Sequence, residues 1–488
     1  MIKFTRYNIL ISAFVLAGIT LIFLIQFWIP TLYGADGYLH IRMAEFLRDL
    51  GPKYNFHWAK FSTFNGGFAD KDFLYHLFLI PFTFFKNIFF GVKLAAAIMA
   101  SLAFIVFFYV LKQYSDRRLL PLALCAFFLS DMFLQAISRP RPIAFVVLIC
   151  LLSAHLMIKK KNFWIFLLGV LYALGHVTSP LIIVFSLIVE AVRYFQKREL
   201  NFKTPLSAFG GVVCGFLIHP NFPGNVKVFI LNAVLVPLYT VKGGILELGA
   251  EFFPLSTREV LFSYPLVILG IAAIILLALS KRPKASFHTN VYFALCLPFF
   301  FLLFVCRRYL MQAYPLMVVA LVLYISDYTA GIKRLNKFVV SGVILLIIVF
   351  GINTYSGIRN SAISAHYFNT HYENAGRWMA ANIPADEVIF HANWSDSQYF
   401  IGLNPKNDYF VTLDPVYMYK KDPELYRLYR DVAFGRVEDP YLILKDTFGV
   451  RYGYAGKNYF SGLIDKIRKD KRFVILAEDR LAIIFKLM

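Results

Sequence analysis

Long apolar runs separated by short polar segments fill most of the first 355 residues of this 488-residue chain. The first run, Asn8 to Pro30, has no charged residue and is long enough to cross a lipid bilayer. Further runs lie at Leu94–Leu111, Leu119–Leu134, Ile143–Met157, Phe163–Leu174, Leu181–Tyr194 and Leu206–Ile218, in three stretches between about residues 262 and 332, and at Phe338–Ile352. The pattern predicts a polytopic α-helical membrane protein with about eleven transmembrane helices.

The segment after the first run combines a carboxylate with an amphipathic pattern. Apolar residues recur at helical spacing from Leu39 to Leu47, which predicts a helix in the membrane interface with Asp36 in its first turn. A carboxylate there is favoured by free backbone N–H groups, so simple helix capping competes with a catalytic role. A shorter apolar stretch, Phe73–Phe85, is interrupted by His76 and is typical of an interfacial or re-entrant segment.

Basic residues determine the predicted topology. Clusters of Lys and Arg follow alternate runs, as the positive-inside rule requires of cytoplasmic loops, at 112–118, 159–161, 197–203, 281–284 and 333–337. Basic residues also precede the first run, which predicts a cytoplasmic N-terminus and, with an odd number of spans, an extracytoplasmic C-terminal part. Arg139, Arg141, Arg307 and Arg308 fall on the outer side, against this rule.

Composition supports the membrane assignment. Apolar residues make up 59% of the chain and charged residues only 16%, whereas a soluble domain carries about 25% charged residues. The net charge of +21 would suit a nucleic-acid partner in a soluble protein, but basic loops account for much of it and no nucleic-acid-binding motif is present. The five cysteines lie in or beside apolar runs, without the spacing of a zinc site or a disulfide framework.

The last part of the chain changes character, because charges become frequent and apolar runs shorten. Its patterns predict helices at Glu373–Asn382, Pro423–Phe434 and Tyr459–Lys469, and strands at Glu387–His391, Tyr409–Leu413, Phe473–Leu476 and Ala482–Phe485. We therefore predict two domains: a transmembrane domain at 1–355, and an extracytoplasmic α/β domain at 356–488.

Ionisable groups gather on the predicted outer face, where polar groups near membrane depth are costly. They are Asp36, Asp131, Arg139, Arg141, His219, Glu247, Glu251, Arg307 and Arg308. Guanidinium groups suit phosphate because they stay charged and can donate to two oxygens, and carboxylates suit a general base or a metal ion. Snorkelling at the interface explains Arg139 equally well. Function is favoured for Arg307 and Arg308, because this pair opens a span directly.

Four segments, in chain order, resemble motifs of the GT-C membrane glycosyltransferases, most of all the catalytic subunit of oligosaccharyltransferases. Gly34-Ala35-Asp36-Gly37-Tyr38 is similar to the first acidic motif, and Glu251-Phe252-Phe253-Pro254 to a Glu-x-x-Pro segment that engages the acceptor. Arg307-Arg308-Tyr309 is similar to an arginine that contacts the donor phosphate. Trp394-Ser395-Asp396-Ser397-Gln398-Tyr399 is similar to a degraded form of the signature that opens the soluble domain. The resemblance implies a GT-C-like fold and inverting transfer of a sugar or oligosaccharide from a polyprenyl phosphate or pyrophosphate lipid to a protein or glycolipid acceptor.

Residue chemistry and resemblance together give a candidate site. The predicted catalytic acids are Asp36 and Glu251. The predicted donor phosphate-binding residues are Arg139, Arg141, Arg307 and Arg308. The predicted acceptor-binding residues are Trp394 and Asp396. Core packing is at least as good an explanation of Trp394, and helix capping an equal one of Asp396. The second acidic motif of the family would fall near Ser138–Pro142, where the chain has arginine and proline instead. With that motif missing, the expectation of a divalent cation, Mg²⁺ or Mn²⁺, at Asp36 rests only on the resemblance of the first acidic motif.

Two other functions are compatible with the same pattern. The first is a transporter or flippase of lipid-linked sugars. Such proteins usually show internal repeats and broken helices with charges near the midplane, whereas no repeat is seen here and the charges lie at the outer boundary. A catalytically inactive relative whose C-terminal domain only binds partners is the third hypothesis. The presence of Asp36 and Glu251 argues mildly against it.

Overall fold

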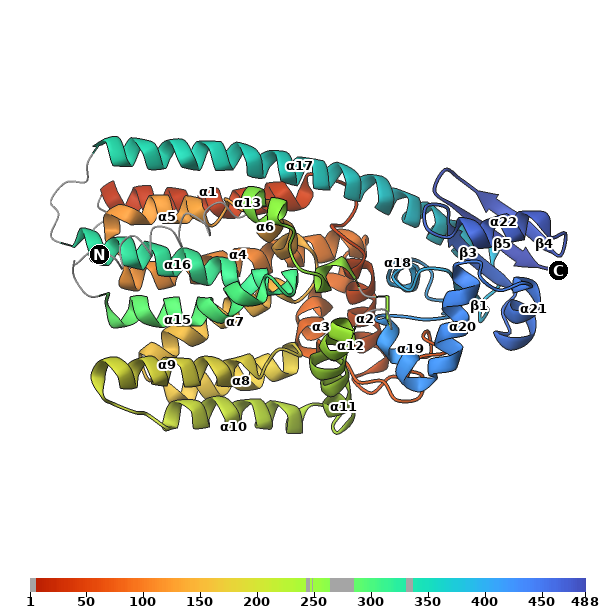
Figure 1. The fold of residues 1–488 in the computed structure, drawn as a ribbon, viewed down its shortest axis with the longest axis horizontal. Helices are drawn as coiled ribbons and strands as arrows, with labels where there is room; N and C mark the ends of the chain where they lie inside the picture. The colour runs from red at the N-terminus through yellow and green to blue at the C-terminus, as the bar shows by residue number, and fades with distance from the viewer. Residues whose placement is uncertain (1–5, 243–245, 248, 264–284, 331–336) are drawn as a thin grey trace.

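The structure is a computed structural model that describes residues 6–242, 246–247, 249–263, 285–330 and 337–488. Figure 1 shows a bundle of roughly parallel helices at one end and a small sheet domain at the other, with the C-terminus farthest from the bundle. The bundle contains α1 (Arg6–Phe27), α4 (Ile88–Tyr114), α5 (Leu120–Ala126), α6 (Asp131–Ser138), α7 (Ile143–Ile158), α8 (Asn162–Gly175), α9 (Leu181–Lys197), α10 (Lys203–Ile218), α15 (Phe287–Leu302), α16 (Leu310–Thr329) and the first part of α17 (Lys337–Asn382).

The length of these helices bears on the predicted number of spans. Among the described residues, four helices are long and apolar enough to cross a membrane, and a fifth span results if the pair Arg117–Ala126 and Asp131–Ser138, bent by 75°, counts as one. Six further apolar helices are shorter. The protein is thus an integral membrane protein, but the count of about eleven is not confirmed, because helices such as α8 have only 14 residues where about 20 are needed. The predicted span near residues 262–280 lies outside the described residues.

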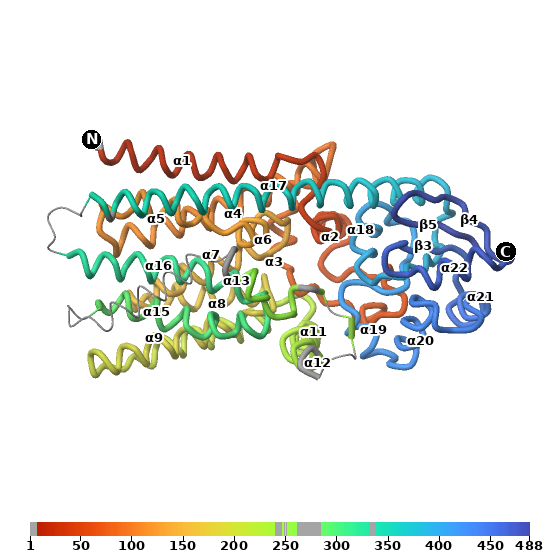
Figure 2. The backbone as a smooth tube through the Cα atoms, turned by 45° about the horizontal axis from the view of Figure 1, so that its top comes forward, coloured from red at the N-terminus to blue at the C-terminus, as the bar shows by residue number. Residues whose placement is uncertain are grey.

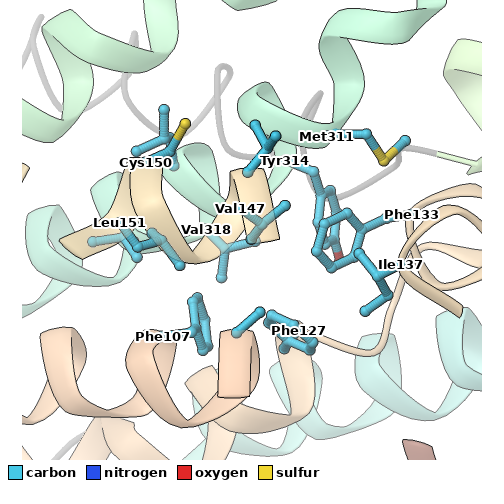
Figure 3. Close-up of a cluster of buried hydrophobic side chains, with 14 of the residues drawn as sticks. Phe107, Phe127, Phe133, Ile137, Val147, Cys150, Leu151, Met311, Tyr314 and Val318 are labelled. Atoms are coloured by element: carbon cyan, nitrogen blue, oxygen red, sulfur yellow. The ribbon is translucent and has the colours of Figure 1, made fainter. Parts of the chain in front are cut away.

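The bundle core forms where α4, α6, α7 and α16 meet around the bend between α5 and α6. Figure 3 shows the side chains that fill it, among them Phe107, Phe127, Phe133, Ile137, Val147, Cys150, Leu151, Met311, Tyr314 and Val318. At the bend, the Tyr314 hydroxyl donates to the Ala126 carbonyl at 2.6 Å, and the Ser130 side chain accepts from the Phe133 N–H at 3.3 Å. Both bonds satisfy backbone groups that a broken helix would leave unpaired in an apolar surrounding.

Short elements lie between the bundle and the sheet domain (Figure 2). They are α2 (Asp36–Leu50), α3 (Phe73–Leu79), η1 (Ile80–Phe84), α11 (Gly224–Ile230), η3 (Leu231–Leu235), α12 (Val236–Lys242), η4 (Ala250–Phe252) and η5 (Arg307–Tyr309). Helix α13 (Thr257–Ser263) lies alongside the bundle (Figure 1), and η2 (Arg117–Leu119) precedes α5. The helix predicted after the first run is α2, and the short stretch predicted next is α3 followed by η1, with Pro81 near the start of η1. The prediction that this helix lies in the membrane interface is not met in full, because the sheet domain covers α2, and eight of its residues are buried.

The C-terminal domain is a five-stranded sheet in the order β2-β1-β3-β5-β4. Its strands are β1 (Val388–His391), β2 (Asp408–Tyr409), β3 (Tyr452–Gly456), β4 (Phe473–Glu478) and β5 (Ala482–Leu487), with β1 parallel to β2 and β3, and β5 antiparallel to β3 and β4. The helices around it are α18 (Asp396–Leu403), α19 (Pro415–Lys421), α20 (Pro423–Ala433), α21 (Pro440–Leu442), η6 (Ile443–Thr447) and α22 (Ser461–Lys469). The predicted strand Tyr409–Leu413 is wrong apart from Tyr409, and β3 was not predicted.

Helix α17 joins the two parts of the molecule. It has 46 residues and runs along the bundle into the sheet domain (Figure 1). The predicted span Phe338–Ile352 and the predicted helix Glu373–Asn382 are both parts of it, and the predicted domain boundary after residue 355 falls inside it. No proline interrupts this stretch, so the helix continues where composition changes from apolar to polar.

The sheet domain is attached to the bundle through α2. The Arg42 guanidinium donates to the Gly402 carbonyl at 3.2 and 2.8 Å, and a Cβ atom on Gly402 would lie 2.5 Å from the Tyr38 carbonyl oxygen. From α17, Glu373 accepts from the Tyr38 hydroxyl at 2.6 Å. The first turns of α2 are therefore fixed between the bundle and the domain.

Candidate functional site

A cavity of about 330 Å³ lies where α2, the loop before α3, the loop between α6 and α7, η4, η5 and the sheet domain meet. Six of the residues predicted for the site line it, namely Asp36, Arg139, Arg141, Glu251, Arg308 and Trp394. They come from five separate segments of the chain. Folding thus brings together most of the charges that the sequence placed on one face.

Asp36 owes its position to the glycines on either side of it. Gly34 adopts a φ of +80° in the turn between α1 and α2, a conformation that residues with a Cβ rarely adopt, and the turn packs against Arg139. Gly37 allows the approach of the next loop, because a Cβ atom there would lie 2.9 Å from Pro140 Cγ. Asp36 then occupies the first turn of α2, at the helix end that favours a carboxylate.

Arg141 connects the two predicted catalytic acids. Its Nη1 lies 3.3 Å from Asp36 Oδ2 and 3.0 Å from Glu251 Oε2. All three side chains are less than one third exposed, so solvent weakens these contacts less than it would on an open surface. Pro142 directly precedes α7, so the short loop that carries Arg141 is restricted on both sides by proline.

Glu251 is held from a second direction by Arg308. Arg308 Nη2 lies 3.7 Å from Glu251 Oε1, and its guanidinium stacks over the Phe252 ring at 4.9 Å. Burial raises the pKa of Glu251, but the positive charges of Arg308 and Arg141 outweigh it and lower the pKa to about 2. Glu251 is therefore ionised at physiological pH, and Arg308 has further hydrogen-bond donors for another anion.

Arg307 points elsewhere, although it is adjacent to Arg308. It pairs with Glu259, with Nη1 at 3.1 Å from Oε1, because consecutive side chains diverge around a 3₁₀ turn. Arg307 lines a second cavity of about 160 Å³, which shares the residues Arg139, Arg141, Glu251 and Arg308 with the first cavity. These four charged residues thus lie between the two cavities.

The two residues predicted to bind the acceptor have different surroundings. Trp394 lines the large cavity. Asp396 is buried beneath it, where its carboxylate accepts from the Tyr372 hydroxyl at 2.7 Å, and it is not part of the cavity wall. Burial raises the pKa of Asp396 to about 7, against the hydrogen bonds that lower it. The structure therefore places Trp394, but not Asp396, where a ligand could touch it.

The cavity contains ionisable residues that the sequence did not single out. They are His40, Asp70, Lys71, Asp72, His76, His176 and Asp414. Lys71 pairs with Asp72 at 2.9 Å, so together these two residues add no net charge to the wall. Burial lowers the pKa of His176 to about 3 and raises the pKa of Asp414. The only sequence signal for this group is that His40 follows Asp36 by four residues and so shares its helix face.

The divalent cation expected at Asp36 does not fit these residues. Asp36 and Glu251 both accept from Arg141, whose guanidinium supplies the positive charge that a cation would supply there. Among the described residues, no group of three or more His, Cys, Asp or Glu side chains is arranged to hold a metal ion.

The arrangement of the helices and the sheet domain defines a fold class, the GT-C fold of membrane glycosyltransferases. The archaeal oligosaccharyltransferase of Archaeoglobus fulgidus, tethered with an acceptor peptide containing a sequon, is similar at a TM-score of 0.61 and 14% identity, covering 96% of this chain and 74% of that one. ArnT from Cupriavidus metallidurans, bound to undecaprenyl phosphate, is similar at a TM-score of 0.61 and 11% identity, covering 97% of both chains.

A third similar structure is the mycobacterial arabinofuranosyltransferase AftD, at a TM-score of 0.56 and 14% identity, covering 97% of this chain and 41% of that one. No protein-family model matches the sequence, and no curated protein matches it significantly. At such low identity the similarity establishes the GT-C fold, and function has to be argued from the cavity.

Proposed function

We propose that the protein is a membrane glycosyltransferase that moves a sugar or oligosaccharide from a polyprenyl phosphate or pyrophosphate lipid to an acceptor on the extracytoplasmic face. One observation carries the proposal: Arg141 joins Asp36 and Glu251 in a cavity that Arg139 and Arg308 also line. A cluster of guanidinium groups beside a carboxylate suits a leaving phosphate next to an acceptor. The fold supports this class of reaction, because the similar ArnT structure is bound to undecaprenyl phosphate.

The arginines would act on the donor. When the bond between sugar and phosphate breaks, negative charge develops on the departing phosphate, and positive groups already in place stabilise it without reorganising. Arg308 is the best placed, because its ion-pair partner Glu251 is 3.7 Å away, which is too far for a hydrogen bond that would occupy its donors. Arg139 lines the same cavity and could donate to further oxygens of the phosphate.

Asp36 would act on the acceptor. Its carboxylate lies at the N-terminal end of α2, where it can accept a hydrogen bond from an acceptor hydroxyl or amide and orient it toward the sugar. Trp394, on the domain side of the cavity, offers a flat apolar face for a sugar ring or an acceptor side chain. We place this cavity and the sheet domain outside the cytoplasm, because the basic clusters predict that orientation.

A transfer assay tests the proposal. The full chain in nanodiscs is incubated with polyprenyl-linked sugars that have been radiolabelled in host membranes, and label that has moved from the donor lipid to a protein or to another lipid is counted. We expect Asp36→Ala and Arg308→Ala each to reduce transfer about 10²–10³-fold, as expected for loss of an acid–base or charge-stabilising group.

The matched control is Arg436→Ala, which removes an arginine from an exposed pair with Asp431 in the sheet domain and should leave transfer unchanged. Transfer at the wild-type rate by both cavity variants would contradict the proposed function.

A further inference from the structure

Three buried side chains in the wall of the cavity are linked by hydrogen bonds. Asp70 Oδ2 lies 2.6 Å from His76 Nδ1, and His76 Nε2 lies 2.8 Å from His40 Nδ1. Asp70 and His76 are 3% and 1% exposed, and His40 is 9% exposed. These residues come from α2, α3 and the loop between them, and all three line the cavity.

The hydrogen bonds determine which ring nitrogens carry protons. Asp70 Oδ1 accepts the backbone N–H of Asp72 at 3.0 Å, so both carboxylate oxygens serve as acceptors and His76 Nδ1 must donate. If His76 is neutral, its Nε2 is an acceptor, and His40 Nδ1 must donate to it. In that arrangement the proton of His40 is on Nδ1, and its Nε2 keeps a lone pair.

This lone pair is available to a ligand. In the described part of the chain, His40 Nε2 has no hydrogen-bond partner, and the ring lies in the wall of the cavity. His40 follows Asp36 by one helical turn, so the two side chains are on the same face of α2. Asp36 is already paired with Arg141, so its carboxylate is less available to take a proton than a nitrogen without a partner. His40 thus combines a free basic atom with a position next to the acid that would orient the acceptor.

We propose that His40 Nε2 takes the proton from the acceptor hydroxyl, with His76 and Asp70 as positioning residues that fix its tautomer. The hydroxyl O–H bond breaks, its oxygen forms a bond to the anomeric carbon, and the bond from that carbon to the phosphate oxygen breaks, with its electron pair leaving on the phosphate. The proton arrives at His40 Nε2. The Nδ1 proton of His40 then moves to His76 Nε2, and that of His76 Nδ1 to Asp70 Oδ2, so no imidazolium remains. This inference rests on the proposed function.

The surroundings of His40 keep its ring neutral before the reaction. Burial and the neighbouring His76 lower the pKa of His40 to about 3, while the carboxylates of Asp72 and Asp36 raise it and the Lys71 ammonium lowers it. The ring of Tyr75 also meets that of His40 edge-on at 5.4 Å. The lone pair is therefore present at physiological pH. A base next to an oriented hydroxyl contributes about 10²–10⁴-fold to such reactions.

The proton arrangement can be measured without a substrate. Nitrogen-15 NMR of the histidine-labelled full chain in nanodiscs, with the His40 signal assigned from its absence in His40→Gln, should show His40 protonated at Nδ1 and unprotonated at Nε2. In Asp70→Asn, the amide oxygen accepts from Asp72 and the amide NH₂ faces His76. The two rings should then reverse, and His40 should be protonated at Nε2. A His40 with Nε2 protonated in the wild type would overturn the inference.

Kinetics test the catalytic part. We expect His40→Gln and Asp70→Asn to lower kcat about 10²–10⁴-fold, with KM and the affinity for undecaprenyl phosphate unchanged, which a merely structural role would not give. Asp408→Asn is the matched control, since it makes the same change at an Asp–His pair on the surface, where His57 lies 2.8 Å away. Unchanged kcat in both relay variants would overturn the inference, even if Asp36→Ala is inactive. If the wild type transfers no sugar, the proposed function fails instead, and the NMR result still stands as a test of the hydrogen-bond chain.

Discussion

At the scale of single residues, Arg141 balances the charge of the cavity. It lies within 3.3 Å of one carboxylate and 3.0 Å of another, so the two acids can approach each other without strong repulsion. The same guanidinium stays charged at any pH that a cell experiences. Asp36 and Glu251 can therefore share a partly enclosed space as two carboxylates around one cation.

This balance predicts the effect of removing the arginine. Arg141→Gln leaves Asp36 without its partner and should destabilise the protein by about 1–3 kcal/mol, between the values for exposed and buried ion pairs. Adding Asp36→Asn should restore much of the loss, because Glu251 keeps Arg308 nearby. Apparent melting temperatures of the two variants in detergent measure this. A double variant no more stable than Arg141→Gln would show that the pairing contributes nothing.

Asp396 gives the domain a pH-dependent stability. Burial raises its pKa from 3.8 in the ordinary case to about 7, so the folded state binds a proton that the unfolded state releases. The contribution of the protonated Asp396 to the free energy of unfolding is complete below about pH 4. It is lost as the pH rises to about 7, which lowers the free energy of unfolding by on the order of 2–4 kcal/mol. We expect the apparent melting temperature to fall between pH 5 and pH 8, and Asp396→Asn to reduce that fall. The same change at the exposed Asp431 is the control, and equal pH dependence in all three proteins would refute this account.

At the scale of elements, α2 is the part on which the site depends. It carries Asp36 and His40 on one face, while Arg42 and Tyr38 hold the sheet domain and α17. A shift of α2 would therefore move the acid, the base and the domain together.

The contact between α2 and α18 yields a prediction about packing. In Gly402→Ala the new methyl group would lie 2.5 Å from the Tyr38 carbonyl oxygen, which is backbone and cannot turn aside. We expect a loss of about 1–3 kcal/mol and a parallel loss of transfer activity. Gly456→Ala in β3 is the control, because its nearest neighbour would be 4.0 Å away. Equal thermal stability of the two variants would contradict the proposed contact.

The periodicity of apolar residues predicted the helices and strands in which that pattern is strong, and it failed where the pattern is weak. The first helix, α2 and strands β1, β4 and β5 follow strong apolar patterns and were predicted close to their bounds. Strand β3, with the sequence Tyr-Gly-Tyr-Ala-Gly, has glycines that indicate a turn, and it is a strand only because β1 and β5 pair with both of its edges. Tertiary pairing here overrides local preference.

At the scale of the whole molecule, the charges of the site were predictable but not their connections. Arg139, Arg141 and Arg308 stand out in the sequence because arginines on the outer side contradict the positive-inside rule. The pairing of His40 with His76, 36 positions apart, depends on α3 folding back onto α2, and no local pattern encodes it.

The central claim is that the cavity beside Asp36 receives the phosphate of a polyprenyl lipid. A cryo-electron microscopy structure of the full chain in nanodiscs with undecaprenyl phosphate tests it most directly. We predict density for the phosphate within about 3 Å of the guanidinium of Arg308, Arg139 or Arg141, with the lipid tail leaving toward the bundle. A phosphate bound outside this cavity, with the Asp36–Arg141–Glu251 contacts untouched, would contradict the account.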